Sequence, residues 1–306
     1  MAKHLRGVVA LLLLLLVGAC TGPRADAPPS NEDHLMSDWY LSLNFEIPGG
    51  YVAAAIEQNG NVLARTTAPL RGRDHVGYYT ARLEPAEAAR LRTKLHDSGY
   101  AKAEEPRELG PDVPTVSIGE GLYGEEPQLE RTFERARLEP RVAEAFEALV
   151  AHVERALESP QAALRATGTL AERRLAPRGE LRFELAFESI GREAAKWPHP
   201  LMALAQGRAR LALQVRELGT ERLQQVELER TRLVLVRPDG SPVADAPSCT
   251  SAPGSVVKLT GSAPAYLEPG KWNAVVLVSL AEPKDSDETS VYGTWTIDLG
   301  TFEVKP

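Results

Sequence analysis

Apolar and polar side chains alternate along the second half of the chain, and this alternation restricts the fold more than any other feature of the sequence. Between Leu181 and Phe187 every second residue is large and apolar. A period of two places those side chains on one face of a β-strand, whose other face meets solvent. The same pattern recurs in Ala209–Val215, Trp272–Leu280 and Trp295–Leu299. Further strands are predicted at Val226–Val236, Val256–Leu259 and Phe302–Val304.

The strands of this half predict a sandwich. About seven to nine short strands, with turn residues between them and no strong helical pattern, indicate two packed antiparallel sheets. Residues 164–306 are therefore predicted to form an all-β domain. The stretch from Tyr266 to Trp272 resembles the L-x-P-G-x-aromatic corner of immunoglobulin-like extracytoplasmic modules. This resemblance implies an immunoglobulin-like sandwich of the cysteine-free bacterial kind, because the paired cysteines of antibody-type domains are missing.

The first half of the chain begins with strands. Trp39–Phe45 alternates, and Tyr51–Glu57 and Val62–Thr67 flank Asn59-Gly60. An Asn-Gly pair between two strands is typical of a hairpin with a two-residue type I′ turn, which needs positive φ angles. Further short strands are predicted at Val76–Leu83, Thr115–Ile118 and Leu129–Phe133.

Two helices interrupt these strands. Pro85 suits the first turn of a helix, Ala88, Leu91 and Leu95 form its apolar stripe, and Gly99 suits its end. A second helix starts at Pro140 and has apolar residues at spacings of three and four, namely Val142, Phe146, Leu149, Val153 and Leu157. Residues 36–158 are therefore predicted to form an α+β domain, an antiparallel sheet with two helices on one face.

The chain opens with the pattern of a signal peptide. Lys3 and Arg6 precede the apolar run Val8–Val17, which is about half the roughly 20 residues that a membrane-spanning helix needs. A short apolar run between a basic start and small residues is typical of a secretory signal peptide. Residues 1–19 are therefore predicted to be removed on export.

The four residues that end at Cys20 (VGAC) resemble the bacterial lipobox. The resemblance implies a diacylglycerol on the Cys20 thiol, cleavage before Cys20 and an acyl group, such as palmitate, on the new amine. Two or more acyl chains hold a protein firmly on a bilayer. If the cell is Gram-negative, the resemblance favours the outer membrane, because Thr21 rather than Asp follows the cysteine. Residues 20–35 lack apolar periodicity and are predicted to form a flexible tether.

Charge and cysteine content agree with an exported protein. The chain has 42 Asp and Glu against 35 Lys and Arg, and removal of residues 1–19 takes away basic residues only. An acidic protein is a poor candidate for binding nucleic acid. Once Cys20 is acylated, Cys249 is alone, so no intramolecular disulfide can form. We expect the Cys249 thiol to be buried, or to be tolerated as a free thiol without a role.

Two motifs match binding signatures only in part. Residues 119–124 read G-x-G-x-x-G, but Glu125, Glu126 and Pro127 follow where a dinucleotide site needs a helix N-terminus. A glycine-rich hairpin or loop is therefore favoured. Residues 285–288 (DSDE) bring three carboxylates together but lack the spacing of an EF-hand. A solvated loop is favoured there.

The titratable residues predict no catalytic or metal site. His75, His96, His152 and His199 lack metal-ligand spacing, and His96 and His152 are expected to be solvated on helix surfaces. No nucleophile elbow or HExxH motif occurs. The arginines between residues 208 and 237 are interleaved with glutamates, which favours ion pairs on a solvated sheet face. We predict no catalytic residue, no cofactor and no bound metal.

One stretch is a candidate interaction loop. Trp197-Pro198-His199-Pro200 combines an aromatic ring with two rigid prolines. If the stretch is exposed, it offers a contact surface for a partner; if it is tucked in, it closes one end of the sandwich core.

Three hypotheses of function follow from these patterns. The favoured one is a membrane-anchored envelope lipoprotein that contacts the bilayer through Cys20 and acts as a non-catalytic binding or assembly module for an unidentified protein. The second is an inhibitor or regulator of an envelope protease or other enzyme. The third, and least favoured, is an envelope hydrolase whose site is assembled from scattered residues.

Overall fold

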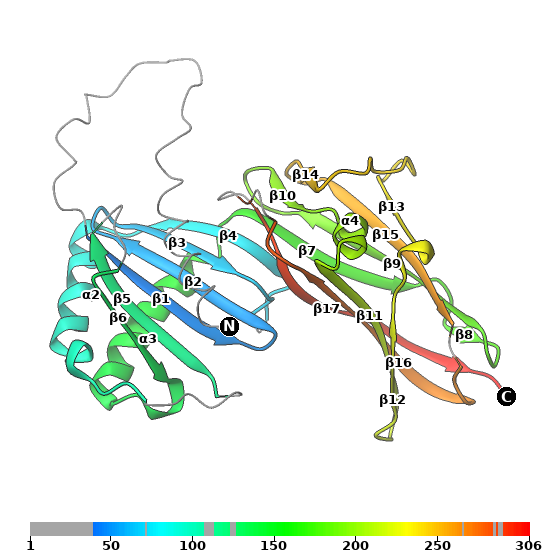
Figure 1. Cartoon of the computed structure of the whole chain (residues 1–306), viewed down its shortest axis with the longest axis horizontal. Coiled ribbons are helices and arrows are strands. Elements are labelled where there is room, and N and C mark those ends of the chain that lie inside the picture. The colour runs from blue at the N-terminus through cyan, green and yellow to red at the C-terminus, as the bar shows by residue number, and fades with distance from the viewer. Residues whose placement is uncertain are drawn as a thin grey trace, which may run out of the picture. The chain divides into compact units, whose positions relative to one another are not determined.

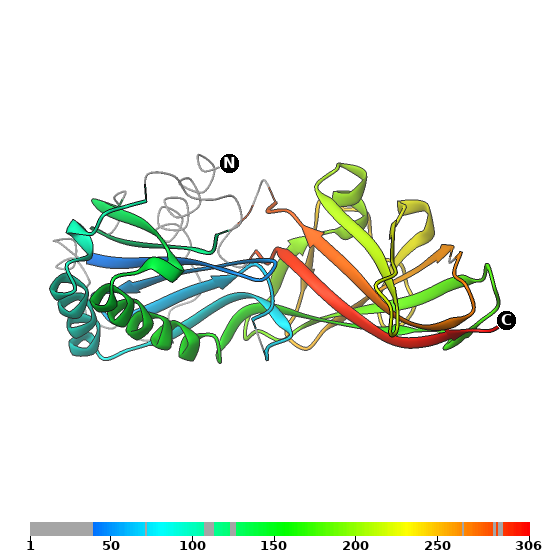
Figure 2. The same ribbon diagram turned by 90° about the horizontal axis from the view of Figure 1, so that it is seen from below.

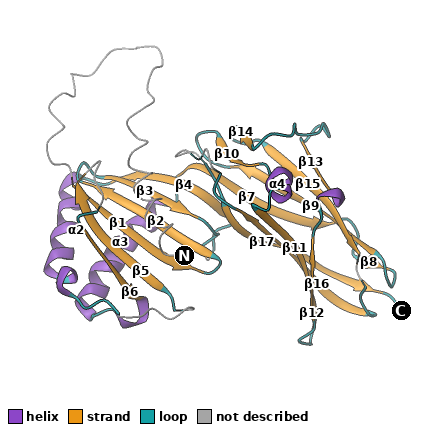
Figure 3. Cartoon of the chain, in the orientation of Figure 1, coloured by secondary structure: helices purple, strands orange, loops and turns teal. Residues whose placement is uncertain are grey.

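The computed structural model describes residues 39–70, 72–106, 113–122, 127–264, 266–283, 286 and 290–306. The protein is mostly β, with large antiparallel sheets (Figures 1 and 3). The predicted signal peptide, Cys20 and the tether lie outside the described residues, as do the three carboxylates of the stretch 285–288. No helix within the described ranges is long and apolar enough to cross a bilayer.

The chain divides into two compact units. The first unit contains the residues up to Ile47 together with Tyr51–Arg65 and Tyr79–Ser159. The second contains Pro160–Pro306 and two earlier segments, Pro48–Gly50 and Thr66–Tyr78. Distant parts of the chain therefore contribute to the second unit.

The first unit is a sheet with two helices. Its strands lie in the order β4-β3-β2-β1-β5-β6. They are β1 (Trp39–Ile47), β2 (Gly50–Glu57), β3 (Asn61–Thr66), β4 (His75–Arg82), β5 (Thr115–Leu122) and β6 (Leu129–Glu134). The part of β4 up to Tyr78 belongs to the second unit. The helices are α2 (Pro85–Asp97) and α3 (Pro140–Ala156), with short 3₁₀ segments η2 (Tyr100–Lys102) and η3 (Arg135–Arg137). Both helices cover the same face of the sheet (Figure 2).

The predicted apolar faces of these elements are buried. Ala88, Leu91 and Leu95 of α2 are buried, as the spacing indicated. The ring of Phe45 on β1 meets that of Phe146 on α3 edge to face, with ring centroids 6.0 Å apart. Helix and sheet therefore share one core.

The hairpin between β2 and β3 is present, but its turn differs from the predicted type I′. A type I′ turn needs positive φ at both central residues. Gly60 has a φ of 90°. Asn59 does not have a positive φ, because Arg178 is the one non-glycine among the described residues that does. The Gly60 N–H donates to the Glu57 carbonyl over 2.9 Å. The connection is thus a three-residue loop in which only Gly60 adopts the left-handed conformation.

The second unit contains two larger sheets. One has the order β13-β15-β9-β7, the other β12-β11-β16-β17-β8, and β10 pairs with β14. Their bounds are β7 (Pro160–Leu170), β8 (Arg174–Leu175), β9 (Glu180–Ser189), β10 (Ala195–Pro198), β11 (Ala209–Glu217), β12 (Leu223–Glu227), β13 (Leu233–Val236), β14 (Ser248–Ser251), β15 (Val256–Pro264), β16 (Gly270–Leu280) and β17 (Gly293–Val304). The helical segments are α4 (Pro200–Ala205) and η4 (Arg230–Arg232).

The inner faces of the two larger sheets form one hydrophobic cluster. Leu185 and Phe187 of β9 belong to it together with Val276 of β16 and Trp295 of β17. The rings of Phe187 and Trp295 meet edge to face, with centroids 6.2 Å apart. Aromatic pairs of this kind stabilise the fold beyond the contribution of the apolar area that they bury.

Two sequence predictions for this unit were wrong in detail. Val226–Val236 was predicted to be one strand, but it is divided between β12 in one sheet and β13 in the other. The chain changes sheets around Leu228, which is buried with 4% exposure. Residues 160–163 were placed between the domains, but they form the start of β7.

Candidate functional site

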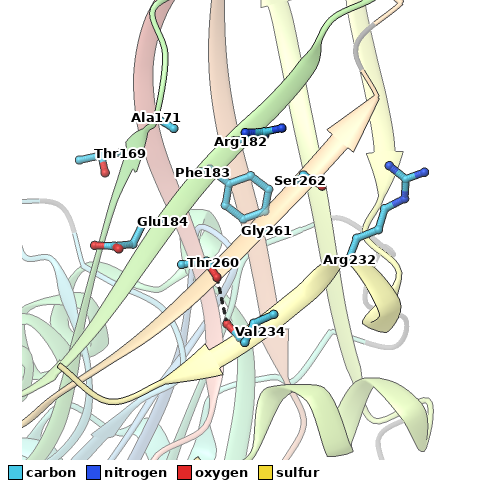
Figure 4. A pocket seen from close by; sticks show the side chains of 10 residues that line it. All are labelled: Thr169, Ala171, Arg182, Phe183, Glu184, Arg232, Val234, Thr260, Gly261 and Ser262. Carbon is cyan, nitrogen blue, oxygen red and sulfur yellow. Dashed lines mark hydrogen bonds between the residues drawn. The ribbon is translucent and has the colours of Figure 1, made fainter. Parts of the chain in front are cut away.

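The outer face of the sheet β13-β15-β9-β7 carries a hollow of about 490 Å³ (Figure 4). Along β9 the side chains of Leu181, Phe183 and Leu185 point into the core, so Arg182 and Glu184 point outward. Short side chains between longer ones leave the hollow open. It is lined by Thr169, Ala171, Arg182, Phe183, Glu184, Arg232, Val234, Thr260, Gly261 and Ser262.

The strand register brings these residues together. Thr260 of β15 lies opposite Glu184 of β9 and opposite Val234 of β13. Thr169 of β7 lies on the other side of Glu184. Three hydroxyl or carboxylate side chains and one valine therefore form a row across the four strands. Val234 is 53% exposed and supplies the apolar part of the row.

The charges around the hollow are paired. The Glu180 carboxylate lies 3.3 Å from an Arg232 guanidinium nitrogen and 3.6 Å from one of Arg182. Ser262 donates a hydrogen bond of 2.8 Å to Glu180. This hydrogen bond and then the two arginines lower the pKa of Glu180. At the other end of the hollow, Lys258 lies 2.8 Å from Glu184.

Ser262 is the hydroxyl group of the hollow that has a carboxylate partner. A nucleophilic serine needs a neighbouring base that can take its proton. The partner of Ser262 is Glu180, and a carboxylate with a lowered pKa is a weak base. Neither His nor Cys lines the hollow. The hydroxyl groups and paired charges of the hollow can form hydrogen bonds with a polar molecule, and the exposed valine can form an apolar contact with it.

The sequence did not reveal this hollow. Alternation showed which residues of each strand face outward, but it could not show which strands are neighbours. Ser262 and Glu180 lie 82 positions apart in the chain and meet only through the pairing of β15 with β9.

The candidate loop 197–200 is buried, so it is not an exposed contact surface. Trp197 has no exposed area, and His199 is 1% exposed. Trp197 and Pro198 lie in β10, whereas Pro200 is the first residue of α4. The Trp197 indole N–H donates to Ser251 Oγ over 2.9 Å, and its ring lies 5.2 Å from that of Phe187. The stretch packs into the core of the second unit and is not exposed, which agrees with the second of the two arrangements that the sequence left open.

His199 also caps the short helix α4. Its Nδ1 accepts a hydrogen bond from the Met202 N–H over 3.3 Å, which requires an unprotonated nitrogen. Burial lowers the pKa of His199, and the nearby Asp245 opposes this shift only in part. The folded protein therefore holds His199 neutral.

We expect the protein to lose stability as the pH falls below about 6.5, the ordinary pKa of histidine. Below that value the unfolded chain binds a proton at His199 that the folded chain does not, so protonation favours unfolding. Urea unfolding of the full chain at about pH 7.5 and about pH 5.5 measures the effect. His199→Asn keeps a capping side chain but cannot titrate, so its midpoint should change less with pH. An equal change in both proteins would contradict this role.

A second cluster joins helix α2 to strand β5. The Glu120 carboxylate accepts hydrogen bonds from Arg92, over 2.6 Å, and from His96, over 2.5 Å. Arg92 also lies over the Trp39 ring, 4.9 Å from its centroid. Burial, and then the charge of Glu120, raise the pKa of Tyr100 to about 12. Among the hydrogen bonds of the described residues, none joins His96 to a Ser, Thr or Cys. We interpret this cluster as a structural link.

His152 was expected to be solvated, but it is 8% exposed. An Arg155 guanidinium nitrogen lies 2.7 Å from its Nδ1, and Glu87 lies 3.5 Å from its Nε2. Burial and the Arg155 charge lower the pKa of His152. Its position on α3 faces α2, a contact that the local sequence could not show.

The described part of the glycine-rich motif, residues 119–122, lies on strand β5, and residues 123 and 124 lie outside the described residues. Gly119 and Gly121 belong to β5, which pairs with β6 in an antiparallel hairpin. A Cβ atom on Gly121 would come within 2.7 Å of the Tyr40 hydroxyl oxygen. The close approach of a neighbouring side chain therefore explains this glycine. The next described element after β5 is the strand β6, not a helix.

The arginine-rich stretch forms ion pairs, as predicted. Arg210 lies 2.7 Å from Glu227, and Arg222 lies 2.5 Å from Glu268. Cys249 is buried, and burial raises the pKa of its thiol to about 12. This thiol is therefore unreactive at neutral pH. In the part of the chain that the structure describes, no three His, Cys, Asp or Glu side chains are arranged to hold a metal ion.

Comparisons with known proteins add no family. No family model matches the chain, and no curated protein sequence matches it. Similar solved structures include AvmM, which catalyses macrocyclization in alchivemycin A biosynthesis, with 11% identity over 47% of this chain and 89% of that chain, at a TM-score of 0.24. The C-terminal domain of wzt has 11% identity over 48% of this chain and 75% of its own, at a TM-score of 0.26. The putative ApaA protein from Bordetella pertussis has 12% identity over 48% of this chain and 98% of its own, at a TM-score of 0.23. Likenesses at these TM-scores carry no argument about this protein.

Proposed function

We propose that this protein is a bacterial envelope lipoprotein that acts as a non-catalytic binding or assembly module. In this proposal the acylated Cys20 holds the chain on the membrane, the outer membrane in a Gram-negative cell. The tether 20–35 then carries an α+β domain and an immunoglobulin-like sandwich. The lipobox-like sequence supports the location, and the two-layered packing of the second unit supports the sandwich.

The observation that carries the binding role is the hollow on the sheet β13-β15-β9-β7. It is rigid because it stands on four paired strands rather than on a loop. Its charges are already paired with one another, so an approaching surface need not bring a net charge. Val234 offers an apolar contact among hydroxyl groups. These properties suit a polar protein surface with a small apolar residue.

The proposal is tested by photo-cross-linking in the native cell. A photoreactive amino acid at position 234 should cross-link to a specific protein, which mass spectrometry then identifies. In a chain that also carries Thr260→Arg, the new side chain fills the hollow, and the cross-link should fall to background. Thr296→Arg is the matched control, because Thr296 is an exposed strand residue of the other sheet.

Two results would overturn the binding role of the hollow. One is that position 234 yields no cross-linked protein. The other is that Thr260→Arg leaves the cross-link as strong as Thr296→Arg does. The identity of the captured protein separates an assembly partner from an envelope enzyme that is regulated by this chain.

A further inference from the structure

The edges of the larger sheets differ in how well they are covered. At β6, the Thr132 N–H donates to the Glu105 carboxylate over 3.0 Å. Next to β13, the Val243 N–H donates to the Leu235 carbonyl over 3.1 Å. β8 is only two residues long. Natural proteins protect edge strands in such ways against pairing with another chain.

Strand β12 lacks this protection. It is the terminal strand of its sheet, and β11 is the one described strand that pairs with it. The pairing runs without a bulge from Leu223 to Glu227, and the strand contains neither Pro nor Lys. Leu223 is 60% exposed. In Figure 1 the tip of the β11–β12 hairpin projects at the bottom of the second unit.

The hydrogen-bond pattern shows which peptide groups of β12 face away from β11. Glu217 N–H donates to the Arg222 carbonyl, and Leu228 N–H donates to the Leu211 carbonyl. In an antiparallel pair, hydrogen-bonded positions recur at every second residue. The peptide groups of residues 224 and 226 therefore point to β11. Those of residues 223, 225 and 227 point outward, and no other described strand lies opposite them.

The charged side chains of this edge do not repel an approaching strand, because they are paired within the chain. Glu227 lies 2.7 Å from Arg210 and also accepts a hydrogen bond of 3.0 Å from Gln225. Gln214 in turn donates to Gln225 over 2.7 Å. At the start of the strand, Arg222 is paired with Glu268. Among the described residues, no strand therefore pairs with the outward-facing peptide groups of β12. The charges of its side chains nearly cancel within the chain.

We propose that β12 pairs in antiparallel fashion with β12 of a second copy of this chain, about a two-fold axis at Gln225. Gln225 of one copy then lies opposite Gln225 of the other, and Leu223 lies opposite Glu227. All three outward-facing residues fall at hydrogen-bonded positions of the new pair, so each exchanges both main-chain hydrogen bonds with its counterpart. Within β12, no like charges lie opposite each other in this register. This self-complementarity favours a second copy over an unrelated strand.

Disulfide trapping in the full chain tests this pairing. Hydrogen-bonded positions of an antiparallel pair have Cα atoms about 5.5 Å apart. This distance lies within the range that a disulfide spans, roughly 4.4–6.8 Å. Under mild oxidation Gln225→Cys should give a covalent dimer. Gln214→Cys, on the neighbouring strand β11, should not, and the unchanged chain supplies the background from Cys20 and Cys249.

A second variant tests the association without a cross-link. Gln225→Lys places two ammonium groups opposite each other at an exposed position, which opposes pairing. Light scattering of the detergent-solubilised full chain should give the mass of two copies for the unchanged chain and one copy for Gln225→Lys. Thr296→Lys, an exposed strand substitution in the same sheet, should retain two copies. Overturning results are a single copy in the unchanged chain, a dimer that Gln225→Lys leaves intact, or equal trapping at positions 214 and 225.

Discussion

Trp197→Ala is expected to destabilise the protein by about 3–5 kcal/mol, the usual cost of removing a large buried ring. Trp197 has no exposed area and packs against Phe187, with ring centroids 5.2 Å apart. The substitution leaves a cavity in the core of the second unit and removes the hydrogen bond to Ser251. Urea unfolding of the full chain, followed by circular dichroism, measures the shift of the midpoint.

A matched control separates burial from a general effect of truncation. Leu218→Ala removes a large apolar side chain that is 48% exposed and lies outside β12, so its effect should stay within about 0.5 kcal/mol. Trp197→Phe keeps a ring in the core and should cost less than Trp197→Ala. A Trp197→Ala chain as stable as the Leu218→Ala chain would show that residues 197–200 do not pack into the core.

Cys20→Ala is expected to abolish membrane anchoring and the incorporation of labelled palmitate. The thiol of Cys20 is the proposed attachment point of the lipid, and without it the chain lacks the two or more acyl chains that hold a protein firmly on a bilayer. Fractionation of cells that express the full chain measures the change from the membrane fraction to the soluble one.

The second cysteine supplies the control for this experiment. Cys249 is buried in the second unit, so Cys249→Ala should leave both labelling and anchoring unchanged. Labelling that persists in Cys20→Ala would contradict the proposed location. Loss of labelling in both variants would instead indicate that a misfolded chain fails to reach the acylating enzymes.

Local periodicity predicted the elements whose burial depends on their own sequence. Helix α2 lies where Ala88, Leu91 and Leu95 repeat at helical spacing, and all three are buried. Strand β9 lies where Leu181–Phe187 alternates, with its apolar residues inside. In these elements the side-chain pattern of one short segment is sufficient to predict the element. The apolar face must be buried, and the pattern does not depend on which other element buries it.

Strand β7 shows why other elements escaped prediction. Its sequence is rich in Ala, Thr and Gly, which have little apolar area to form a visible pattern. Instead, the backbone of β7 packs closely against two glycines. A Cβ atom on Gly77 would come within 2.3 Å of the Ala162 carbonyl oxygen, and one on Gly191 within 2.4 Å of the Gln161 carbonyl oxygen. The two glycines that leave room for the backbone of β7 lie outside β7 in the sequence, so the sequence of β7 alone does not reveal this packing.

The sequence by itself determined which faces of the strands and helices are apolar, and it singled out Cys20 as the proposed attachment point. Only the tertiary structure decided that Trp197 is inside, that Val226–Val236 serves two sheets and that Ser262 meets Glu180. Trp197 and its partner Ser251 are 54 positions apart. Alternation reports the environment of one strand, whereas a core, a hollow or a free edge depends on which strands become neighbours, and that is decided by contacts between distant parts of the chain.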